Sequence, residues 1–112
     1  MSARFLEHPS PNFDARARAV DLVVLHYTGM QDAEIALARL CDPAPLAGKY
    51  PGPWQDAHID PATQLARASA HYVVNEQGQV FRLVDEAQRA WHAGVSSWEG
   101  EGDVNSRSIG IE

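Results

Sequence analysis

Cysteine is almost absent from this sequence, since Cys41 is its single thiol. One cysteine cannot form a disulfide within the chain, and it cannot supply the several thiolates of a cysteine-based zinc cluster. Disulfide-stabilised folds and thiolate clusters are therefore excluded. We expect Cys41 to be an inert thiol in the core or on a helix face.

Basic side chains are also few. The chain has 9 Lys and Arg against 15 Asp and Glu, which gives a formal net charge of −6, and no run of basic residues occurs. Binding to nucleic acid needs clustered Lys and Arg to neutralise phosphates. Nucleic acid is therefore excluded as a partner.

Long apolar runs are missing as well. No stretch approaches the roughly 20 residues that a membrane-spanning helix needs. The opening MSARFLEHPSPNFDAR lacks the basic start and the apolar segment of a secretory signal. These absences predict no membrane span and a cytoplasmic location, whereas a periplasmic or cell-envelope location would require a leader that has been removed.

What the sequence does contain is enough apolar material for a core. Its 112 residues are 45% hydrophobic and 21% charged, with all three aromatic residue types present. A chain of this size and composition is typical of one globular domain. We therefore expect a single domain over residues 1–112, acting as a monomer.

The first half of the chain predicts one strand and one helix. After an extended, proline-containing lead-in at HPSPNFDARARAVD, residues 21–27 (DLVVLHY) form a continuous β-branched run, which predicts a buried central strand ending near His26. A helix is predicted after the capping residue Asp32. The apolar residues of this helix recur at helical spacing, at Ala33, Ala36, Leu37 and Leu40. The charged residues Glu34 and Arg39 are expected to face solvent.

The second half predicts an insertion followed by strands. Five of the seven prolines lie between Asp42 and Pro61, which predicts a proline-rich insertion over 42–67 with at most one helical turn, from Asp60 to Arg67. Residues 69–84 (SAHYVVNEQGQVFRLV) predict a β-hairpin with its turn at NEQG. A long polar, glycine-rich loop is expected over 85–107, before a last strand at SIGIE. The sum predicts an α/β fold with a central mixed β-sheet and flanking helices.

Histidines are the first candidates for chemistry. His26 would stand at the end of a strand, where the sheet beneath it holds an imidazole rigidly enough for zinc ligation. The alternative is a hydrogen-bonded core histidine. His71 and His92 could converge with His26 on one metal, although no short-range ligand spacing supports that arrangement.

Two further positions have both a functional and a structural interpretation. Trp91 and His92, in AWHAG, suit the lip of a ligand-binding site, and the alternative is a tryptophan that covers the edge of a sheet. Glu112 could take a proton from water beside a metal. The alternative is an ordinary exposed glutamate.

Five segments together resemble one enzyme family. HPSPNFDAR, VVLHYT, SAHYVV, AWHAGVSSW and NSRSIGIE, in this order, are similar to the zinc-dependent N-acetylmuramoyl-L-alanine amidases of bacterial type 2, which are related to phage amidases and peptidoglycan recognition proteins. The resemblance runs from His8 to the last residue, interrupted by the insertion. It implies an amidase-like α/β fold and a muropeptide or peptidoglycan substrate.

The resemblance also implies roles for individual residues. His26 matches the family's first zinc ligand, and Glu112 matches the residue that orients and deprotonates the zinc-bound water. Trp91 and His92 match segments that contact the muropeptide, and His71 matches a core position that does not bind metal. The implied reaction is hydrolysis of the amide between N-acetylmuramic acid and L-alanine, with Zn²⁺ as cofactor.

One departure from the family limits these expectations. The family's second and third zinc ligands, a His and an Asp or Cys, follow the SIGIE strand, so the resemblance implies that residues 1–112 are the N-terminal portion of a longer enzyme. We expect this portion alone to bind zinc weakly and to have little activity. Two alternatives stay open: a non-catalytic module that binds muropeptides, and an α/β interaction domain without a metal.

Overall fold

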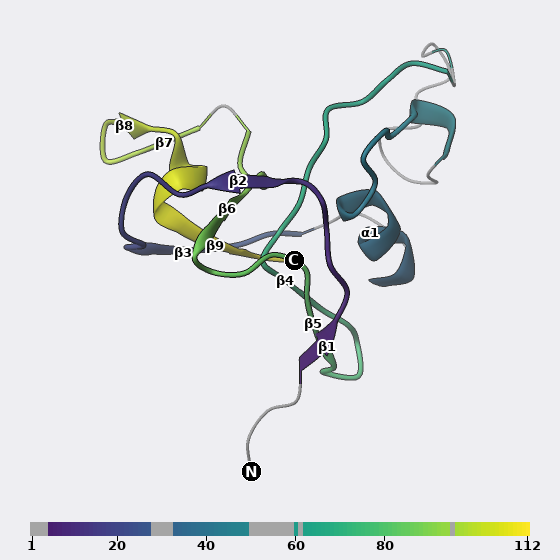
Figure 1. Cartoon of the computed structure of the whole chain (residues 1–112), viewed down its shortest axis with the longest axis horizontal. Helices are drawn as coiled ribbons and strands as arrows, with labels where there is room; N and C mark the ends of the chain where they lie inside the picture. Colours follow the sequence, from purple (N-terminus) through teal and green to yellow (C-terminus); the bar gives the residue numbers. More distant parts are fainter. Residues whose placement is uncertain (1–4, 28–32, 50–59, 61, 95) are drawn as a thin grey trace.

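Five strands form a mixed sheet in a computed structural model that describes residues 5–27, 33–49, 60, 62–94 and 96–112 (Figure 1). The strand order is β1-β5-β4-β9-β3. The strands are β1 Phe5–Glu7, β3 Leu22–Leu25, β4 Tyr72–Val74, β5 Val80–Arg82 and β9 Ser108–Ile111. Only β4 and β5 pair antiparallel, while the other three pairings are parallel. The predicted central mixed sheet is confirmed.

The β4–β5 hairpin has the predicted turn. Asn75 accepts hydrogen bonds on its side-chain oxygen from the backbone N–H groups of Gln77 and Gln79. Gly78 has a φ of +80°, a left-handed conformation in which a residue with a Cβ is strained. The Asn and the Gly of NEQG therefore have separate structural roles, one in hydrogen bonding and one in backbone geometry.

The β3 strand differs from the prediction of a buried central strand. Within the described residues it pairs only with β9 and stands at the edge of the sheet. Val23 is 62% exposed and Leu25 is 77% exposed, whereas the alternate residues Leu22 and Val24 are half-buried. A continuous apolar run indicates burial on both faces, but the described part of the chain covers only one face of β3.

The predicted helix is confirmed as α1, Ala33–Leu40, while its predicted cap Asp32 lies outside the described residues. Leu37 and Leu40 are 6% and 5% exposed, and burial of each such side chain stabilises the fold by roughly 1.5–3 kcal/mol. Arg39 departs from the expected solvent position, because its guanidinium reaches across to donate to the Ala66 carbonyl at 2.7 Å. No helix among the described residues is both long and apolar enough to cross a membrane.

The hydrophobic core lies between α1 and the sheet. Figure 1 shows α1 at one end of the molecule, away from the strands β7 (Ser97–Trp98) and β8 (Glu101–Gly102) at the other. The buried apolar residues come from the helix, the hairpin and the segments that flank it: Leu37, Leu40, Ala70, Val73, Leu83, Val84 and Ala90. The core therefore joins the first half of the chain to the second.

The lead-in before β3 contributes buried polar side chains to the fold. Asn12 is fully buried, and its side-chain NH₂ donates to the carbonyls of Asp42 and Ala68, each at 2.9 Å. The Ser10 hydroxyl donates to the Leu40 carbonyl at 2.5 Å. These side chains supply hydrogen-bond donors to backbone carbonyls at the end of α1 and in the segment before β4. Buried carbonyls in irregular segments need such partners for the fold to be stable.

The proline-rich insertion is described only in part, since residues 50–59 and 61 lie outside the described residues. A short 3₁₀ helix, η1, spans Ala47–Lys49, and an isolated bridge joins Leu46 to Gln64. Among the described residues of the segment from Asp60 to Arg67, where a helical turn was expected, no helix is assigned, and the Thr63 N–H donates to the Asp60 carbonyl.

The region expected to be a loop over 85–107 contains regular structure. The strand β6, Gln88–Ala90, pairs antiparallel with β2, Phe13–Ala15. The strands β7 and β8 form a small ribbon, and a 3₁₀ helix, η2, spans Val104–Arg107. These strands are two or three residues long, too short for hydrophobic periodicity to reveal them.

The Cys41 thiol gives a first testable consequence of the packing. Burial raises its pKa from 9.0 to about 11, and only the thiolate is nucleophilic. We expect iodoacetamide at pH 8 to alkylate Cys41 about 100-fold more slowly in the folded chain than in urea, because two pKa units change the thiolate fraction by about that factor. A folded-state rate within tenfold of the rate in urea would contradict the prediction.

Candidate functional site

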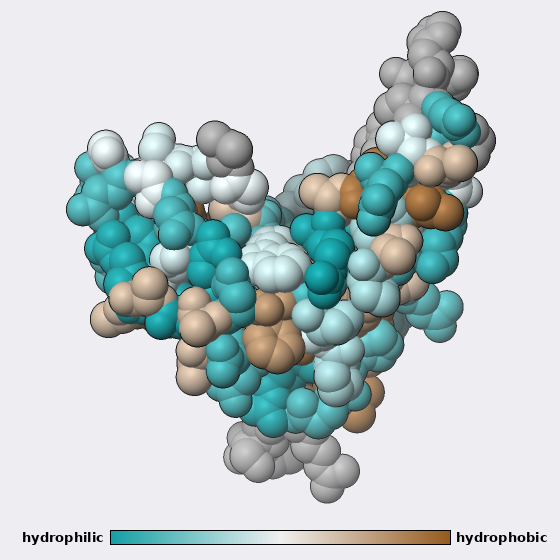
Figure 2. Space-filling view, turned by 45° about the horizontal axis from the view of Figure 1, so that its top comes forward, coloured by the Kyte–Doolittle hydropathy of each residue, from teal (hydrophilic) through white to brown (hydrophobic). Residues whose placement is uncertain are grey.

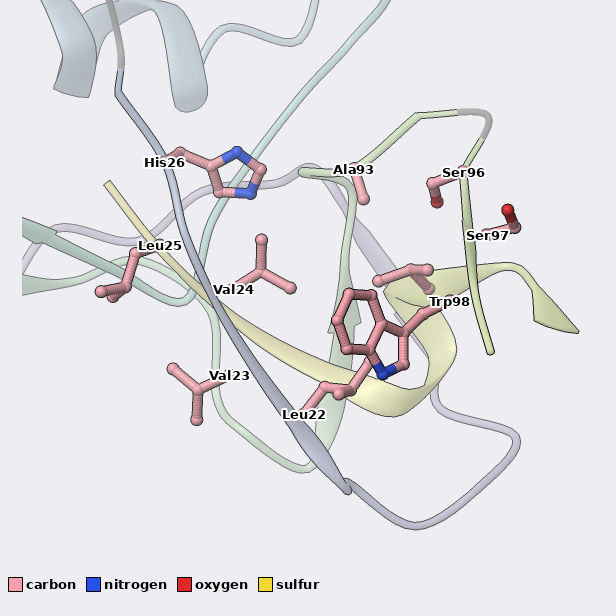
Figure 3. Close-up of a pocket in the computed structure, with 10 residues that line it drawn as sticks. Leu22, Val23, Val24, Leu25, His26, Ala93, Ser96, Ser97 and Trp98 are labelled. Atoms are coloured by element: carbon pink, nitrogen blue, oxygen red, sulfur yellow. The ribbon is translucent and has the colours of Figure 1, made fainter. Parts of the chain in front are cut away.

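His26 directly follows β3, and β9 holds it in place. Its backbone N–H donates to the Ile111 carbonyl at 2.8 Å, which extends the β3–β9 ladder by one residue beyond the pair of Leu25 and Ile111. Figure 3 shows the His26 ring on the same side of β3 as Val24, while Val23 and Leu25 point to the other side. The predicted rigid mounting of this imidazole at a strand end is therefore present.

Glu112 continues β9 next to His26. In the parallel register Val24 pairs with Gly110, so the following positions on the same face are His26 and Glu112. Neighbouring strands lie about 4.8 Å apart, so the backbone positions of His26 and Glu112 are adjacent and their side chains leave the same face of the sheet. Glu112 is half-buried, and burial raises the pKa of its carboxyl group. The alternative of an ordinary exposed glutamate does not fit this position.

His92 packs directly against His26. Its Nδ1 lies 2.8 Å from His26 Nε2, and the ring centroids are 5.0 Å apart in an edge-to-face arrangement. Burial, followed by the neighbouring His26 and His71, lowers the pKa of His92 to about 3. Burial also lowers the pKa of His26. Both rings are thus held as neutral imidazoles, the form that binds metal ions.

His71 is buried in the layer next to His92 and does not share a metal site with it. The centroids of these two rings are 6.2 Å apart. His71 Nδ1 accepts a hydrogen bond from the Gly110 N–H at 3.1 Å, and its Nε2 lies 2.9 Å from the Gln88 carbonyl. Both nitrogens are therefore occupied by the protein. The three histidines stand in a row, but among the described residues no group of three His, Cys, Asp or Glu side chains is arranged to hold a metal.

Trp91 lies at the start of the segment that carries His92. Its backbone N–H donates to the Ser69 hydroxyl at 2.9 Å, and the Arg67 guanidinium carbon lies 5.2 Å from the indole centroid, a cation–π distance. The ring is half-buried. A contact of Trp91 or His92 with substrate stays a prediction, and for His92 it is limited by the protein partners that already occupy both ring nitrogens.

A pocket of about 460 Å³ opens beside His26. Its walls come from β3 and from residues that follow His92, among them Ala93, Ser96 and Trp98 (Figure 3). Trp98 is 54% exposed, so an indole face is available at the pocket. The space-filling view shows one face of the molecule, whose surface is hollowed between two raised parts (Figure 2). Trp98 is a candidate that sequence reasoning missed, although it closes the AWHAGVSSW motif.

Arg16 connects the segments that carry the site residues. It was not identified as a site residue from the sequence. Its guanidinium donates to the carbonyls of Glu86, Gln88, Ser106 and Ser108 at 2.8–3.2 Å, and a longer contact reaches Asn105. Burial lowers its pKa. One planar fork therefore joins the segment before β6 to η2 and the start of β9. The sequence signal that could have identified Arg16 is its position at the end of HPSPNFDAR, one of the five segments that resemble the amidase family.

Two other contacts hold the strands that carry the site. Arg107 makes a bidentate ion pair with Asp21 at 2.6 and 2.7 Å, just before β9 and β3 begin, and this arginine holds the pKa of Asp21 below its usual value. The Asn105 side-chain oxygen accepts from the backbone N–H groups of His92 and Ala93 at 3.0 and 2.9 Å. These contacts set the register of β3 on β9 and fix the His92 backbone.

Comparison with known proteins gives the family. The model of the N-acetylmuramoyl-L-alanine amidase family matches residues 16–112. The 1,6-anhydro-N-acetylmuramyl-L-alanine amidase AmpD of Citrobacter freundii is 33% identical over 117 residues, covering 93% of this chain and 54% of that protein. The N-acetylmuramoyl-L-alanine amidase AmiD of Escherichia coli K12 is 31% identical over 100 residues, covering 83% of this chain and 28% of that protein.

Solved structures show the same fold. A crystal structure of a selenomethionine AmpD derivative superposes with a TM-score of 0.69 at 29% identity, covering 99% of this chain and 61% of that chain. The complex of E. coli AmiD with anhydro-N-acetylmuramic acid-L-Ala-D-γ-Glu-L-Lys has a TM-score of 0.55 at 30% identity, covering 88% of this chain and 32% of that one. The chain thus spans about half the length of the AmpD relatives it matches.

The family model covers most of the chain, including the His26 strand, the AWHAGVSSW segment and Glu112. The resemblance inferred from the five segments is thereby confirmed. This protein belongs to the N-acetylmuramoyl-L-alanine amidase family.

Proposed function

We propose that this chain forms part of a zinc-dependent amidase that hydrolyses the bond between N-acetylmuramic acid and L-alanine in muropeptides. The observation that carries the proposal is the pairing of His26 and Glu112. An imidazole and a carboxyl group leave the same face of the sheet from adjacent positions, directly after two paired parallel strands. A ligand and a general base in this arrangement are what metal-assisted hydrolysis requires.

The donor atoms present fit a zinc ion in part. Within the described residues His26 Nδ1 has no hydrogen-bond partner, and an imidazole nitrogen is a preferred zinc ligand. His26 is the one ligand that we assign, so the remaining ligands are proposed to lie outside the described residues. Bound zinc would polarise the amide carbonyl and lower the pKa of a water molecule toward about 7.

The chain's own residues supply the remaining functions. Glu112 accepts the proton of the attacking water, a task for which its half-buried position and raised carboxyl pKa are suited. The pocket beside His26 holds part of the muropeptide, with the Trp98 indole as an apolar surface for a sugar or peptide group. Trp91 and His92 remain proposed substrate contacts.

The substrate class follows from the named relatives. AmpD is named a 1,6-anhydro-N-acetylmuramyl-L-alanine amidase, and AmiD was solved with an anhydro-muropeptide. We propose anhydro-muropeptides as substrates here, in a cytoplasmic recycling reaction carried out by a monomer. The location and the oligomeric state are sequence predictions.

A second candidate function is muropeptide binding without hydrolysis. It is favoured by one observation, that the described residues contain no cluster of three metal-binding side chains. A module of this kind would use the same pocket and would leave the amide intact. Zinc content and turnover distinguish the two functions.

The proposal predicts a zinc requirement that depends on His26. The complete gene product is expected to bind zinc stoichiometrically and to release the stem peptide from an anhydro-muropeptide, and His26→Ala should remove both properties because a ligand is lost. His8→Ala changes an exposed histidine and should leave both unchanged. Zinc is measured by atomic absorption and the peptide by chromatography.

Three results would count against parts of this proposal. Full zinc content in His26→Ala would refute the metal assignment. Muropeptide binding without turnover in the zinc-loaded protein would favour the second candidate function. Robust turnover by residues 1–112 alone would refute the expectation that further ligands lie beyond them.

A further inference from the structure

We propose that Ser108 and His92 are positioning residues, which hold His26 in one tautomer through a directed chain of hydrogen bonds. The chain runs from the Val104 carbonyl through Ser108 and His92 to His26. It leaves the His26 Nδ1 lone pair available to a metal ion. The identity of that metal rests on the proposed function, but the direction of the chain does not.

The direction is set at the buried end, by Ser108. This serine is fully buried, and its Oγ lies 2.7 Å from the Val104 carbonyl oxygen. Two oxygens at that distance repel each other unless a proton lies between them, and a carbonyl oxygen carries none. The hydroxyl therefore donates to Val104. Because a hydroxyl has one proton, Ser108 can only accept from its other neighbour.

That other neighbour is His92 Nε2, at 2.9 Å from Ser108 Oγ. Since the hydroxyl accepts, His92 must carry its proton on Nε2. In a neutral imidazole the other nitrogen is then an acceptor. His92 Nδ1 therefore faces His26 Nε2, 2.8 Å away, with a lone pair.

The last link assigns the tautomer of His26. A lone pair on His92 Nδ1 requires a proton on His26 Nε2, because two facing lone pairs at 2.8 Å would repel. The His26 Nδ1 atom is then unprotonated. In a metal-binding histidine, the hydrogen bond made by one ring nitrogen determines that the other nitrogen is the ligand atom. The hydrogen bonds from Val104 to His26 therefore leave Nδ1 of His26 as the ligand atom.

The residues that form these hydrogen bonds are also held in place by close packing. The His92 ring lies over the backbone of Gly110 so closely that a Cβ at that glycine would stand 2.4 Å from His92 Cγ. The Asn105 side chain holds the His92 backbone from the other side. Glycine at position 110 is thus required by the close approach of the ring, and the hydrogen bonds to Ser108 and His26 fix which way the His92 nitrogens face.

The test is the tautomer of each histidine in the zinc-free complete gene product, measured by long-range ¹H–¹⁵N NMR on ¹⁵N-histidine-labelled protein. Both His92 and His26 are expected to carry the proton on Nε2. Ser108→Ala removes the acceptor for His92 Nε2–H, so His26 should become a mixture of tautomers. Zinc affinity, measured by competition with a chelator, should fall roughly 10- to 100-fold.

Two further variants separate positioning from a general loss of structure. Thr63→Ala removes an exposed hydroxyl outside the pocket and should change neither readout. Ser108→Thr retains the hydroxyl and is expected to keep the Nε2–H tautomer of His26. In the zinc-loaded protein the metal should be bound through His26 Nδ1.

Each outcome decides between distinct claims. A proton on His26 Nδ1 in the unsubstituted zinc-free protein would overturn the inference, even if Ser108→Ala failed to fold. Unchanged tautomers and zinc affinity in a folded Ser108→Ala variant would also overturn it. If both histidines have the expected tautomers but the protein binds no zinc, the inferred series of hydrogen bonds is supported and the proposed function is refuted.

Discussion

Replacing Glu112 by glutamine is expected to lower the rate of amide hydrolysis by about 10²- to 10⁴-fold, the usual contribution of a general base. Glutamine has nearly the same shape as glutamate but cannot take a proton from water. Its amide would still occupy the half-buried position directly after β9. The measurement is kcat for an anhydro-muropeptide in the zinc-loaded complete gene product.

The control for this variant is Glu76→Gln, which changes an exposed glutamate in the β4–β5 turn. It should leave the rate unchanged. Zinc content and muropeptide binding should also be retained by Glu112→Gln, since we assign Glu112 no ligand role. A variant that keeps more than a tenth of the rate would show that Glu112 is not the general base.

Replacing Arg16 by alanine is expected to destabilise the fold by about 3 kcal/mol or more. The guanidinium donates to carbonyls of the segment before β6, of η2 and of β9. Each buried carbonyl left without a donor costs about 1–3 kcal/mol, although water can reach some of them because Arg16 is only half-buried. The measurement is the free energy of unfolding from urea titration, compared at constant m-value.

Two variants show whether the geometry of the guanidinium matters. Arg16→Lys keeps the charge but loses the planar fork, so an intermediate loss is expected. Arg18→Ala removes an exposed ion pair with Glu101 and should change the stability by no more than about 1 kcal/mol. Equal effects of Arg16→Ala and Arg18→Ala would contradict the role assigned to Arg16.

Local patterns in the sequence predicted the elements that depend on neighbouring residues. The α1 helix follows from the spacing of its apolar face, and the β4–β5 hairpin follows from an Asn and a Gly in its turn. The edge position of β3 did not follow, because an apolar run is the same whether one face or both are covered. The short strands of 85–107 were missed because two or three residues carry no measurable period.

The candidate site was predictable only as a list of residues. His26 and Glu112 followed from the resemblance, and their positions at the ends of strands agree with it. Arg16, Asn105 and Ser108 were not identified, because each acts through a hydrogen bond to a residue whose partner the sequence does not indicate. The supporting residues of a site have weaker sequence signals than its ligands, since they need only one donor or acceptor in the right place.

The sequence by itself determined the class of fold, the helix and hairpin, the membership of an amidase family, and a histidine at a strand end. Only the tertiary structure decided that His26 meets His92, 66 positions away, that Ser108 completes their hydrogen bonds, and that position 112 lies next to position 26 in the sheet. Hydrophobic periodicity and turn residues depend on near neighbours along the chain. The parallel pairing of β3 with β9 and the buried hydrogen bonds from Ser108 to His26 form only when distant segments pack together.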